Sequence, residues 1–296
     1  MKRPAPPKKA ITKTKKAAPH RRNTRKSKQP DALQKAKRWV ILVFIAVLVV
    51  AAYKYHNGLL YYLGFKTDKN IDALTKEERK LADLRIYEIV GRNKDKVFGI
   101  DVSHYQGRIN WKELQKAEEE FPLHFIFMRA TAGKDGKDTR FAHNWKKAGE
   151  NGYIRGAYHY YRPDENSLVQ AEHFIKTVKL AKGDLPPVLD IEKIPNRQSM
   201  DSLKVGLQRW LGRVEAHYGM QPILYSGESF YTDFLKKEFS GYRVWIANYS
   251  FFEEDIKKEW LFWQFTDQAQ IKGIEGNVDV NIYNGSLESL LTHVKK

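Results

Sequence analysis

Asp190 and Glu192 stand two residues apart at the end of an apolar run, PVLDIE at 187–192. On a β-strand this spacing places both side chains on one face, with Cα atoms roughly 6.6 Å apart at about 3.3 Å per residue. Two acids on the inner face of an apolar strand repel each other, and burial adds to this, so one is expected to stay protonated near neutral pH. The pattern is typical of a general acid beside a stabilising carboxylate.

Two more acids follow the same alternation on other predicted strands. Asp101 in GIDVS and Asp279 in VDV each stand between aliphatic residues, so their side chains are expected to face inward with the first pair. A single aspartate at a strand end is simply explained as a hydrogen-bonded polar residue, but acids from three strands favour a catalytic centre. A metal site is the main alternative. The histidines of this region have no paired ligand spacing, and we interpret His104 as a hydrogen-bonding wall residue. We expect no metal and no cofactor.

Aromatic residues at the strand ends favour a carbohydrate substrate, because sugar rings stack their C–H faces on such side chains. Aromatic residues in strands usually belong to the core, which is our interpretation of Phe125, Phe127, Phe262 and Phe265. A tyrosine at a strand end differs, since its hydroxyl needs a partner or water. The predicted substrate-binding residues are Tyr158, Tyr160, Tyr225, Trp245, Tyr249 and Gln264.

Eight short apolar runs supply the strands that must position these side chains. They cover 97–103, 125–131, 154–161, 187–192, 222–226, 244–249, 261–266 and 278–283. Helical patterns fill the first five gaps, at 110–120, 138–150, 164–182, 200–218 and 229–239, and the last two gaps are expected to be loops. The pattern predicts an α/β barrel with a helix-poor last third, shorter than the roughly 250 residues of a full eightfold barrel. Its site is expected at the C-terminal ends of the strands.

Charge divides the chain before the barrel. Residues 1–38 contain 15 of the 52 Lys and Arg residues and one acid, so most of the +17 net charge lies there. We predict a disordered basic cytoplasmic tail over 1–38, because this composition offers no apolar surface to bury. Residues 66–96 are charged, with Leu and Ile at positions 74, 81, 84, 86 and 89, and are interpreted as a helical spacer. The absence of cysteine excludes thiol catalysis, thiolate metal sites and disulfides.

Residues 39–53, WVILVFIAVLVVAAY, carry no charge. Fifteen residues fall short of the roughly 20 that span a bilayer, but the flanking Arg38 and Lys54 can reach the headgroups. We predict a transmembrane signal anchor over 39–53, or extended to residue 65, with a cleaved signal peptide as the alternative. The protein would then be a single-pass membrane protein. Its N-terminus would be cytoplasmic and its catalytic domain would lie in the periplasm or otherwise outside the cytoplasmic membrane. Specific nucleic-acid binding by the tail is not expected.

Motifs along the barrel region occur in the order of a known family. They are FGIDVSHYQGRINW at 98–111, FIFMRATAG at 125–133, RGAYHYYRP at 155–163, PPVLDIE at 186–192, PILYSG at 222–227, VWIANY at 244–249, WQFT at 263–266 and GNVDVNIYNG at 276–285. Across 97–285 the chain resembles glycoside hydrolase family 25, the Chalaropsis-type lysozymes. The resemblance implies a catalytic domain over 97–290, folded as a flattened TIM-like barrel of five β/α units plus three further strands. It also implies N-acetylmuramidase activity on the β-1,4 bond between N-acetylmuramic acid and N-acetylglucosamine in peptidoglycan.

The resemblance also assigns roles to the four acids. Glu192 matches the general acid, and Asp190, Asp101 and Asp279 match its accompanying carboxylates. Asp190 either attacks the anomeric carbon or orients the substrate's 2-acetamido group, and the sequence leaves both routes open. Many members read A-T-E-G where this chain reads ATAG at 130–133, so Ala132 lacks a carboxylate in the groove.

Peptidoglycan glycan strands are the partner that the resemblance implies. Two alternatives belong to other classes of protein: a non-catalytic membrane-tethered peptidoglycan-binding module and a chitinase-like hydrolase. The complete set of carboxylates disfavours the first, and the order of the motifs disfavours the second.

Overall fold

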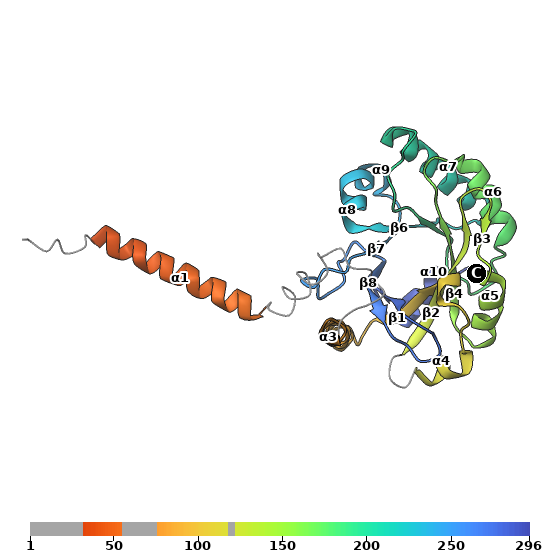
Figure 1. Ribbon diagram of the computed structural model, residues 1–296. Helices are drawn as coiled ribbons and strands as arrows, with labels where there is room; N and C mark the ends of the chain where they lie inside the picture. Colours follow the sequence, from red (N-terminus) through yellow and green to blue (C-terminus); the bar gives the residue numbers. More distant parts are fainter. Residues whose placement is uncertain (1–31, 55–75, 118–121) are drawn as a thin grey trace, which may run out of the picture. The chain divides into compact units, whose positions relative to one another are not determined.

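The structure, a computed structural model, describes residues 32–54, 76–117 and 122–296. The chain forms two units, Met1–Tyr53 and Lys54–Lys296, and the second is called the barrel unit below (Figure 1). Most of the predicted basic tail, residues 1–31, lies outside the described residues, as do residues 55–75.

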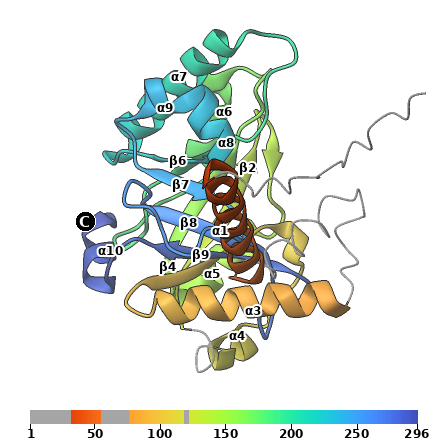
Figure 2. The same cartoon turned by 90° about the vertical axis from the view of Figure 1, so that its left-hand side faces the viewer.

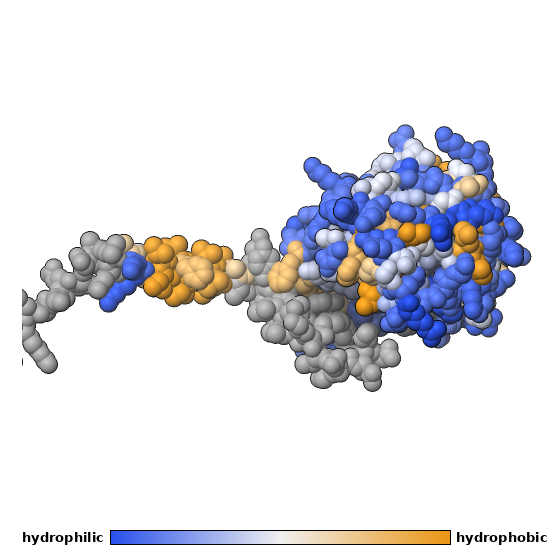
Figure 3. Space-filling model, turned by 90° about the horizontal axis from the view of Figure 1, so that it is seen from above, coloured by the Kyte–Doolittle hydropathy of each residue, from blue (hydrophilic) through white to orange (hydrophobic). Residues whose placement is uncertain are grey.

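Helix α1, Ala32–Lys54, contains the apolar segment. Its large apolar side chains are exposed, and its surface is almost continuously hydrophobic in Figure 3. In the part of the chain that the structure describes, no helix is both long enough and apolar enough to cross a membrane. The transmembrane helix predicted over 39–53 is therefore not supported. Its fifteen uncharged residues would extend only about 22 Å at 1.5 Å per residue, less than the roughly 30 Å of a hydrocarbon core.

Eight strands close into a barrel in the second unit, as the sequence predicts. They are β1 (Val97–Val102), β2 (Leu123–Ala132), β4 (Ile154–Tyr160), β5 (Val188–Asp190), β6 (Ile223–Gly227), β7 (Val244–Ala247), β8 (Phe262–Ala269) and β9 (Val278–Tyr283). The strand order is β1-β9-β8-β7-β6-β5-β4-β2, and pairing of β1 with β2 closes the ring. Only β9 runs antiparallel to its barrel neighbours. A two-residue strand that the sequence did not predict, β3 (Gly136–Lys137), extends β2 as a hairpin.

Helices surround the outside of the barrel (Figure 1). They are α4 (Trp111–Ala117), α5 (Phe141–Glu150), α6 (Ser167–Thr177), α7 (Met200–Tyr218) and the broken helix α8–η2–α9 (Glu228–Phe239). Helices α6 and α7 lie side by side (Figure 2). Helix α10 (Leu287–His293) follows the last strand and was not predicted. The segments between β7 and β8 and between β8 and β9 consist entirely of described residues, and they contain no helix.

Alternation along the strands separates two apolar cores. On β2, Phe125 and Phe127 point into the barrel interior, whereas Ile126 and Met128 belong to the core under the helices. The Phe125 and Phe127 rings fit in the interior only because the residues beside them are glycines, which have no side chain. A Cβ on Gly156 would come within 2.1 Å of the Phe127 ring, and one on Gly99 within 2.4 Å of the Phe125 ring. Glycine at these strand positions therefore lets the barrel interior close around phenylalanine.

Helix α3, Lys76–Arg92, packs against the barrel with most of the predicted face, since Ile89 is buried, Ile86 packs against the core and Leu81 is half-buried. Ala82, Arg85 and Ile89 are buried, whereas Leu84, expected on the packed side, is 43% exposed. Arg85 donates hydrogen bonds to the backbone carbonyls of Phe265 and Ser250. The prediction from apolar spacing was wrong at Leu84, because spacing of apolar residues does not show that Arg85 is a buried donor to the barrel.

Candidate active site

A cavity of about 320 Å³ opens at the C-terminal end of the parallel strands. All ten predicted site residues line it: Asp101, Tyr158, Tyr160, Asp190, Glu192, Tyr225, Trp245, Tyr249, Gln264 and Asp279. Asp279 reaches the same end from the start of β9, because that strand runs in the opposite direction and pairs Asp279 with Asp101. Barrel closure thus brings together side chains from seven strands and two adjoining loops.

Asp101 lies at the centre of a buried hydrogen-bond network. Its Oδ2 accepts from Gln264 Nε2 at 2.7 Å and from Asn281 Nδ2 at 2.8 Å. Burial raises the pKa of Asp101 to about 7, and the nearby Glu192 adds to the rise, while both amide hydrogen bonds oppose it. Asp101 is therefore held in the cavity wall by two hydrogen bonds, with an affinity for protons near neutral pH.

Asp190 ends β5, and Glu192 follows it at the mouth of the cavity. The pKa of Asp190 is raised well above its usual range, first by burial and then by the carboxyl groups of Glu192 and Asp101. Its Oδ1 is buried without a hydrogen-bond partner among the described residues. Glu192 is exposed on its outer side, yet its partly buried carboxyl group also has a raised pKa. A protonated glutamate at the mouth beside a deeper aspartate can donate a proton to one side of a bound group and offer negative charge to the other.

Asp279 completes the set of acids. Burial raises its pKa well above the usual range, and the carboxylates of Asp101 and Asp267 raise this pKa further. Asp267, on β8, also lines the cavity and was not predicted, because strand 261–266 was expected to end before it. Like-charged residues directly opposite each other on paired strands destabilise a sheet, so this cluster works against folding stability.

The aromatic residues divide into two groups. Tyr225 and Tyr249 both donate their hydroxyls to Gln264 Oε1, and Trp245 Nε1 donates to Asn281 Oδ1 at 2.8 Å. They therefore orient the two amides that hold Asp101. The Trp245 ring is 2% exposed and stacks on Phe127, with ring centroids 4.5 Å apart.

Tyr158 and Tyr160 differ from this group because they form no hydrogen bond to Gln264 or Asn281 among the described residues, and both are only partly buried, as Tyr249 also is. A partly exposed ring leaves a face available for a ligand. These two tyrosines are therefore the predicted stacking residues whose position best suits contact with a sugar.

Several lining residues were missed by the sequence reasoning. Arg129, on the inner face of β2 after Phe125 and Phe127, lines the cavity, and so do Tyr105 and Gln106. The alternation of Phe125, Phe127 and Arg129 along β2 could have predicted that the Arg129 side chain also points inward. Asn281 could likewise have been found two residues beyond Asp279.

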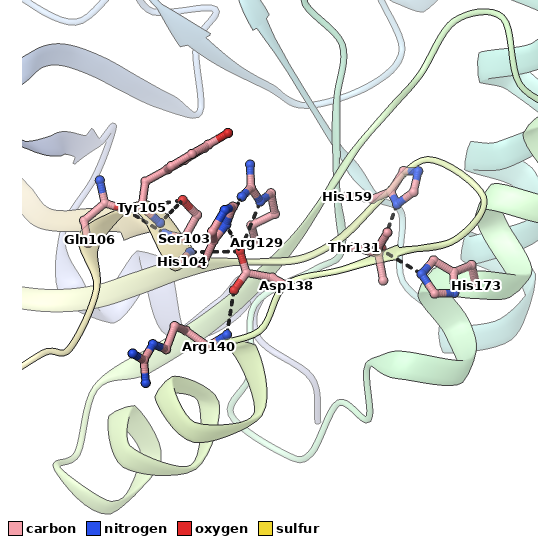
Figure 4. Close-up of polar contacts among 11 residues, drawn as sticks. Ser103, His104, Tyr105, Gln106, Arg129, Thr131, Asp138, Arg140, His159 and His173 are labelled. Carbon is pink, nitrogen blue, oxygen red and sulfur yellow. Dashed lines mark hydrogen bonds and ion pairs between the residues drawn. The ribbon is translucent and has the colours of Figure 1, made fainter.

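A buried acid fixes Arg129. The Arg129 guanidinium lies beside Asp138, with Nε donating to Oδ2 at 3.2 Å, and over the Tyr105 ring (Figure 4). His104, the wall residue of the sequence analysis, also contacts Asp138 through Nδ1 at 3.1 Å. In the described ranges, no group of three or more His, Asp or Glu residues is arranged to hold a metal ion.

Comparison with known proteins agrees with this geometry. The family model described as "Glycosyl hydrolases family 25" matches residues 100–274. The chain is 40% identical over 200 residues to YegX of Escherichia coli (strain K12), covering 67% of this chain and 73% of that protein. It is 33% identical to Lysozyme M1 of Streptomyces globisporus, over 66% of this chain and 70% of that protein.

A solved structure supports the fold as well. The family 25 glycosyl hydrolase from Bacillus anthracis superposes with a TM-score of 0.61 at 28% identity, covering 69% of this chain and 95% of that one. The family match spans more than half of the sequence, and the barrel carries an inward-facing set of acids at its mouth. The chain therefore belongs to glycosyl hydrolases family 25 and is a glycoside hydrolase.

Proposed function

We propose that the barrel unit is an N-acetylmuramidase that hydrolyses the β-1,4 bond between N-acetylmuramic acid and N-acetylglucosamine in peptidoglycan. The observation that carries this proposal is the placement of Asp190 and Glu192 in one cavity, with partly exposed Tyr158 and Tyr160 beside them. Relatives named lysozyme and N,O-diacetylmuramidase support the choice of substrate. The family's division into five β/α units is supported by the helices that lie between consecutive strands from β1 to β7.

Glu192 is the general acid of this proposal. It lies at the open mouth, where a glycan strand can enter, and its raised pKa favours the protonated form that the first step needs. It donates its proton to the glycosidic oxygen as the bond to the anomeric carbon breaks. The leaving sugar then departs with a hydroxyl group.

Asp190 lies deeper and faces the other side of the sugar. It either attacks the anomeric carbon or orients the 2-acetamido oxygen that does so, and in both routes its negative charge stabilises the oxocarbenium-like transition state. Water then attacks the anomeric carbon and opens the intermediate, and the ionised Glu192 takes the proton from that water and is restored. Arg129 favours the ionised form of Asp190, because its positive charge opposes the rise that burial and the neighbouring carboxyl groups cause in the pKa of Asp190. Asp101 and Asp279 complete the electrostatic surroundings, and Gln264, Tyr225, Tyr249 and Trp245 keep Asp101 in place.

The test is mass spectrometry of soluble fragments released from purified peptidoglycan by the full-length chain, with Glu192→Gln as the matched control. Fragments ending in reducing N-acetylmuramic acid, absent from the control, are expected. Reducing N-acetylglucosamine ends would show that a different bond is cut. No release, with the protein pelleting on the wall, would point to a binding module, and cleavage of chitin oligomers in preference to peptidoglycan would point to a chitinase-like enzyme.

The location follows from the substrate. Peptidoglycan lies outside the cytoplasmic membrane, so the barrel unit is expected there, held at the membrane surface by the exposed apolar side chains of α1. The predicted cytoplasmic placement of residues 1–38 depends on a membrane-crossing helix, which is not supported among the described residues, and attachment through the surface of α1 does not include it. Cell fractionation tests the attachment: the full chain is expected in the membrane pellet, and a chain with Val43, Ile45 and Leu48 replaced by serine is expected to be released. Equal pelleting of both would contradict attachment through α1.

A further inference from the structure

A second cavity, of about 590 Å³, adjoins the catalytic one. Tyr105, Arg129 and Tyr160 line both, so the two cavities share a wall. The second is bounded by the β2–β3 hairpin on one side and by Lys193, the residue after Glu192, on the other. A group bound there would lie within reach of a sugar held at the catalytic acids.

Positive charge dominates the lining of this second cavity. Its cations are Arg129, Lys137, Arg162 and Lys193, and Asp138 is its carboxylate. Among the residues that the structure describes, neither Lys137 nor Lys193 forms an ion pair, although Lys193 Nζ lies 5.7 Å from the centre of the Tyr160 ring. Arg162 Nη1 forms ion pairs with Glu165 Oε1 at 3.3 Å and with Asp135 Oδ1 at 3.5 Å. The Arg162 side chain is nevertheless 45% exposed.

Asp138 offsets the charge of Arg129 through their ion pair, and it is buried away from Lys137 and Lys193, which keep their charges unpaired among the described residues. The Asp138 side chain is 1% exposed. It accepts hydrogen bonds from the backbone N–H groups of His104 and Arg140, each at 2.9 Å, and from Arg129 Nε (Figure 4). Its role is to hold the Arg129 guanidinium against the shared wall.

The alanine at position 132 adds no negative charge to the cavity. Ala132 lines it at the end of β2, opposite Gly136 of the hairpin. A methyl group there contributes neither a carboxylate to pair with Lys137 nor bulk to fill the space. The cavity therefore keeps its volume and several cations, which is the chemistry of a site for a carboxylate-bearing ligand.

We propose that this cavity, called the peptide cavity below, binds the carboxylate-bearing stem peptide attached to N-acetylmuramic acid. The inference rests on the proposed muramidase function, because that peptide hangs from the sugar whose bond is cut. The peptide cavity makes the enzyme prefer glycan that carries stem peptides over bare glycan. Binding energy from this remote part of the substrate positions the sugar against Asp190 and Glu192.

The test compares kcat/KM of the full-length chain on intact glycan strands with kcat/KM on the same strands after an amidase has removed the stem peptides. Wild type is expected to favour the peptide-bearing strands about tenfold, which corresponds to about 1.4 kcal/mol. Lys137→Glu is expected to bring that ratio close to one, mainly by raising KM on peptide-bearing strands, and Lys137→Gln is expected to give an intermediate ratio. Ala132→Glu is expected to act in the same direction as Lys137→Glu.

Lys112→Glu is the matched control, because Lys112 is exposed on α4 and lines neither cavity. It is expected to keep the wild-type ratio at every salt concentration, whereas the wild-type preference itself should weaken as salt screens the cations. Equal kcat/KM of wild type on both substrates would overturn the proposal. So would an unchanged ratio in both Lys137 variants with wild-type thermal unfolding. Failure to cut either substrate would instead contradict the proposed muramidase function.

Discussion

The barrel interior has an apolar floor and an acidic mouth built from the same strands. On β5, Val188 belongs to the interior apolar core, and Asp190, the next residue on that face, carries a carboxyl group into the cavity. On β1, Val97 belongs to the interior core and Asp101 follows on the same face, with Gly99 between them. One or two steps of the strand repeat thus separate a side chain that stabilises the fold from one whose burial costs free energy. Burial of apolar side chains in the floor stabilises the fold, whereas burial of carboxyl groups at the mouth destabilises it. Mutations at the mouth are therefore expected to lower activity, and mutations in the floor to lower the free energy of unfolding.

The largest expected effect is on activity, at the mouth. Glu192→Gln and Asp190→Asn are each expected to lower kcat by about 10²–10⁴-fold, because each removes an acid that acts only in the transition state. Neither is expected to lower the unfolding temperature, since an amide is cheaper to bury than a charged carboxylate. Turnover of purified peptidoglycan and thermal unfolding measure the two quantities. Near wild-type turnover by either variant would contradict the role given to that residue.

The floor should respond in the opposite way. Phe127 is fully buried and packs against Trp245, Phe125 and Phe262. Phe127→Ala is expected to lower the free energy of unfolding by about 3–5 kcal/mol through lost burial and a residual cavity. Urea unfolding measures this, with Tyr87→Ala as a control because Tyr87 is 77% exposed on α3. A loss in Phe127→Ala no larger than in the control would show that the floor does not carry the stability.

The pH dependence of stability sharpens the comparison. Folding raises the pKa of Asp101 from an ordinary 3.8 to about 7, so the folded state binds its proton more tightly than the unfolded chain does. The resulting stabilisation is fully present below about pH 4 and is lost as the pH rises through about 7. The contribution of Asp101 to unfolding free energy should therefore decline across this range. Asp101→Asn should flatten the decline measured by urea unfolding at several pH values, and an unchanged slope would contradict the assignment.

The smallest effect is expected at the cross-strand pair of acids. Asp279 lies opposite Asp101, and Asp279→Asn should raise the free energy of unfolding at pH 8 by about 0.2–1 kcal/mol by removing like-charge repulsion. Asp83→Asn, on the exposed side of α3, serves as a control for loss of one negative charge. A destabilised Asp279→Asn protein would mean that this carboxylate has a stabilising partner in the fold. Urea unfolding of the three proteins side by side distinguishes these results.

Strand alternation made most of the barrel predictable. Eight apolar runs gave the eight strands, and parity alone placed Asp101, Asp190 and Asp279 on the inward face. The spacing of apolar residues was less informative where a polar side chain is buried against residues far away in the sequence. The burial of Arg85 was not predicted, because its acceptors, the carbonyls of Phe265 and Ser250, are far away in the sequence. The apolar segment over 39–53 was expected to span a membrane, but its length within α1 does not support that prediction.

The sequence by itself determined which side chains share a face, because that depends only on the two-residue repeat of a strand. It also determined that acids, tyrosines and an amide would meet at one end of the barrel. Only the tertiary structure decided what each of them contacts. Asp101 accepts its two hydrogen bonds from Gln264 and Asn281, which are 163 and 180 positions away in the sequence. The register of the strands and the closure of the barrel bring these residues together. The peptide cavity has the same origin, since its cations come from β2, the β2–β3 hairpin and the loops after β4 and β5, and no local pattern brings these together.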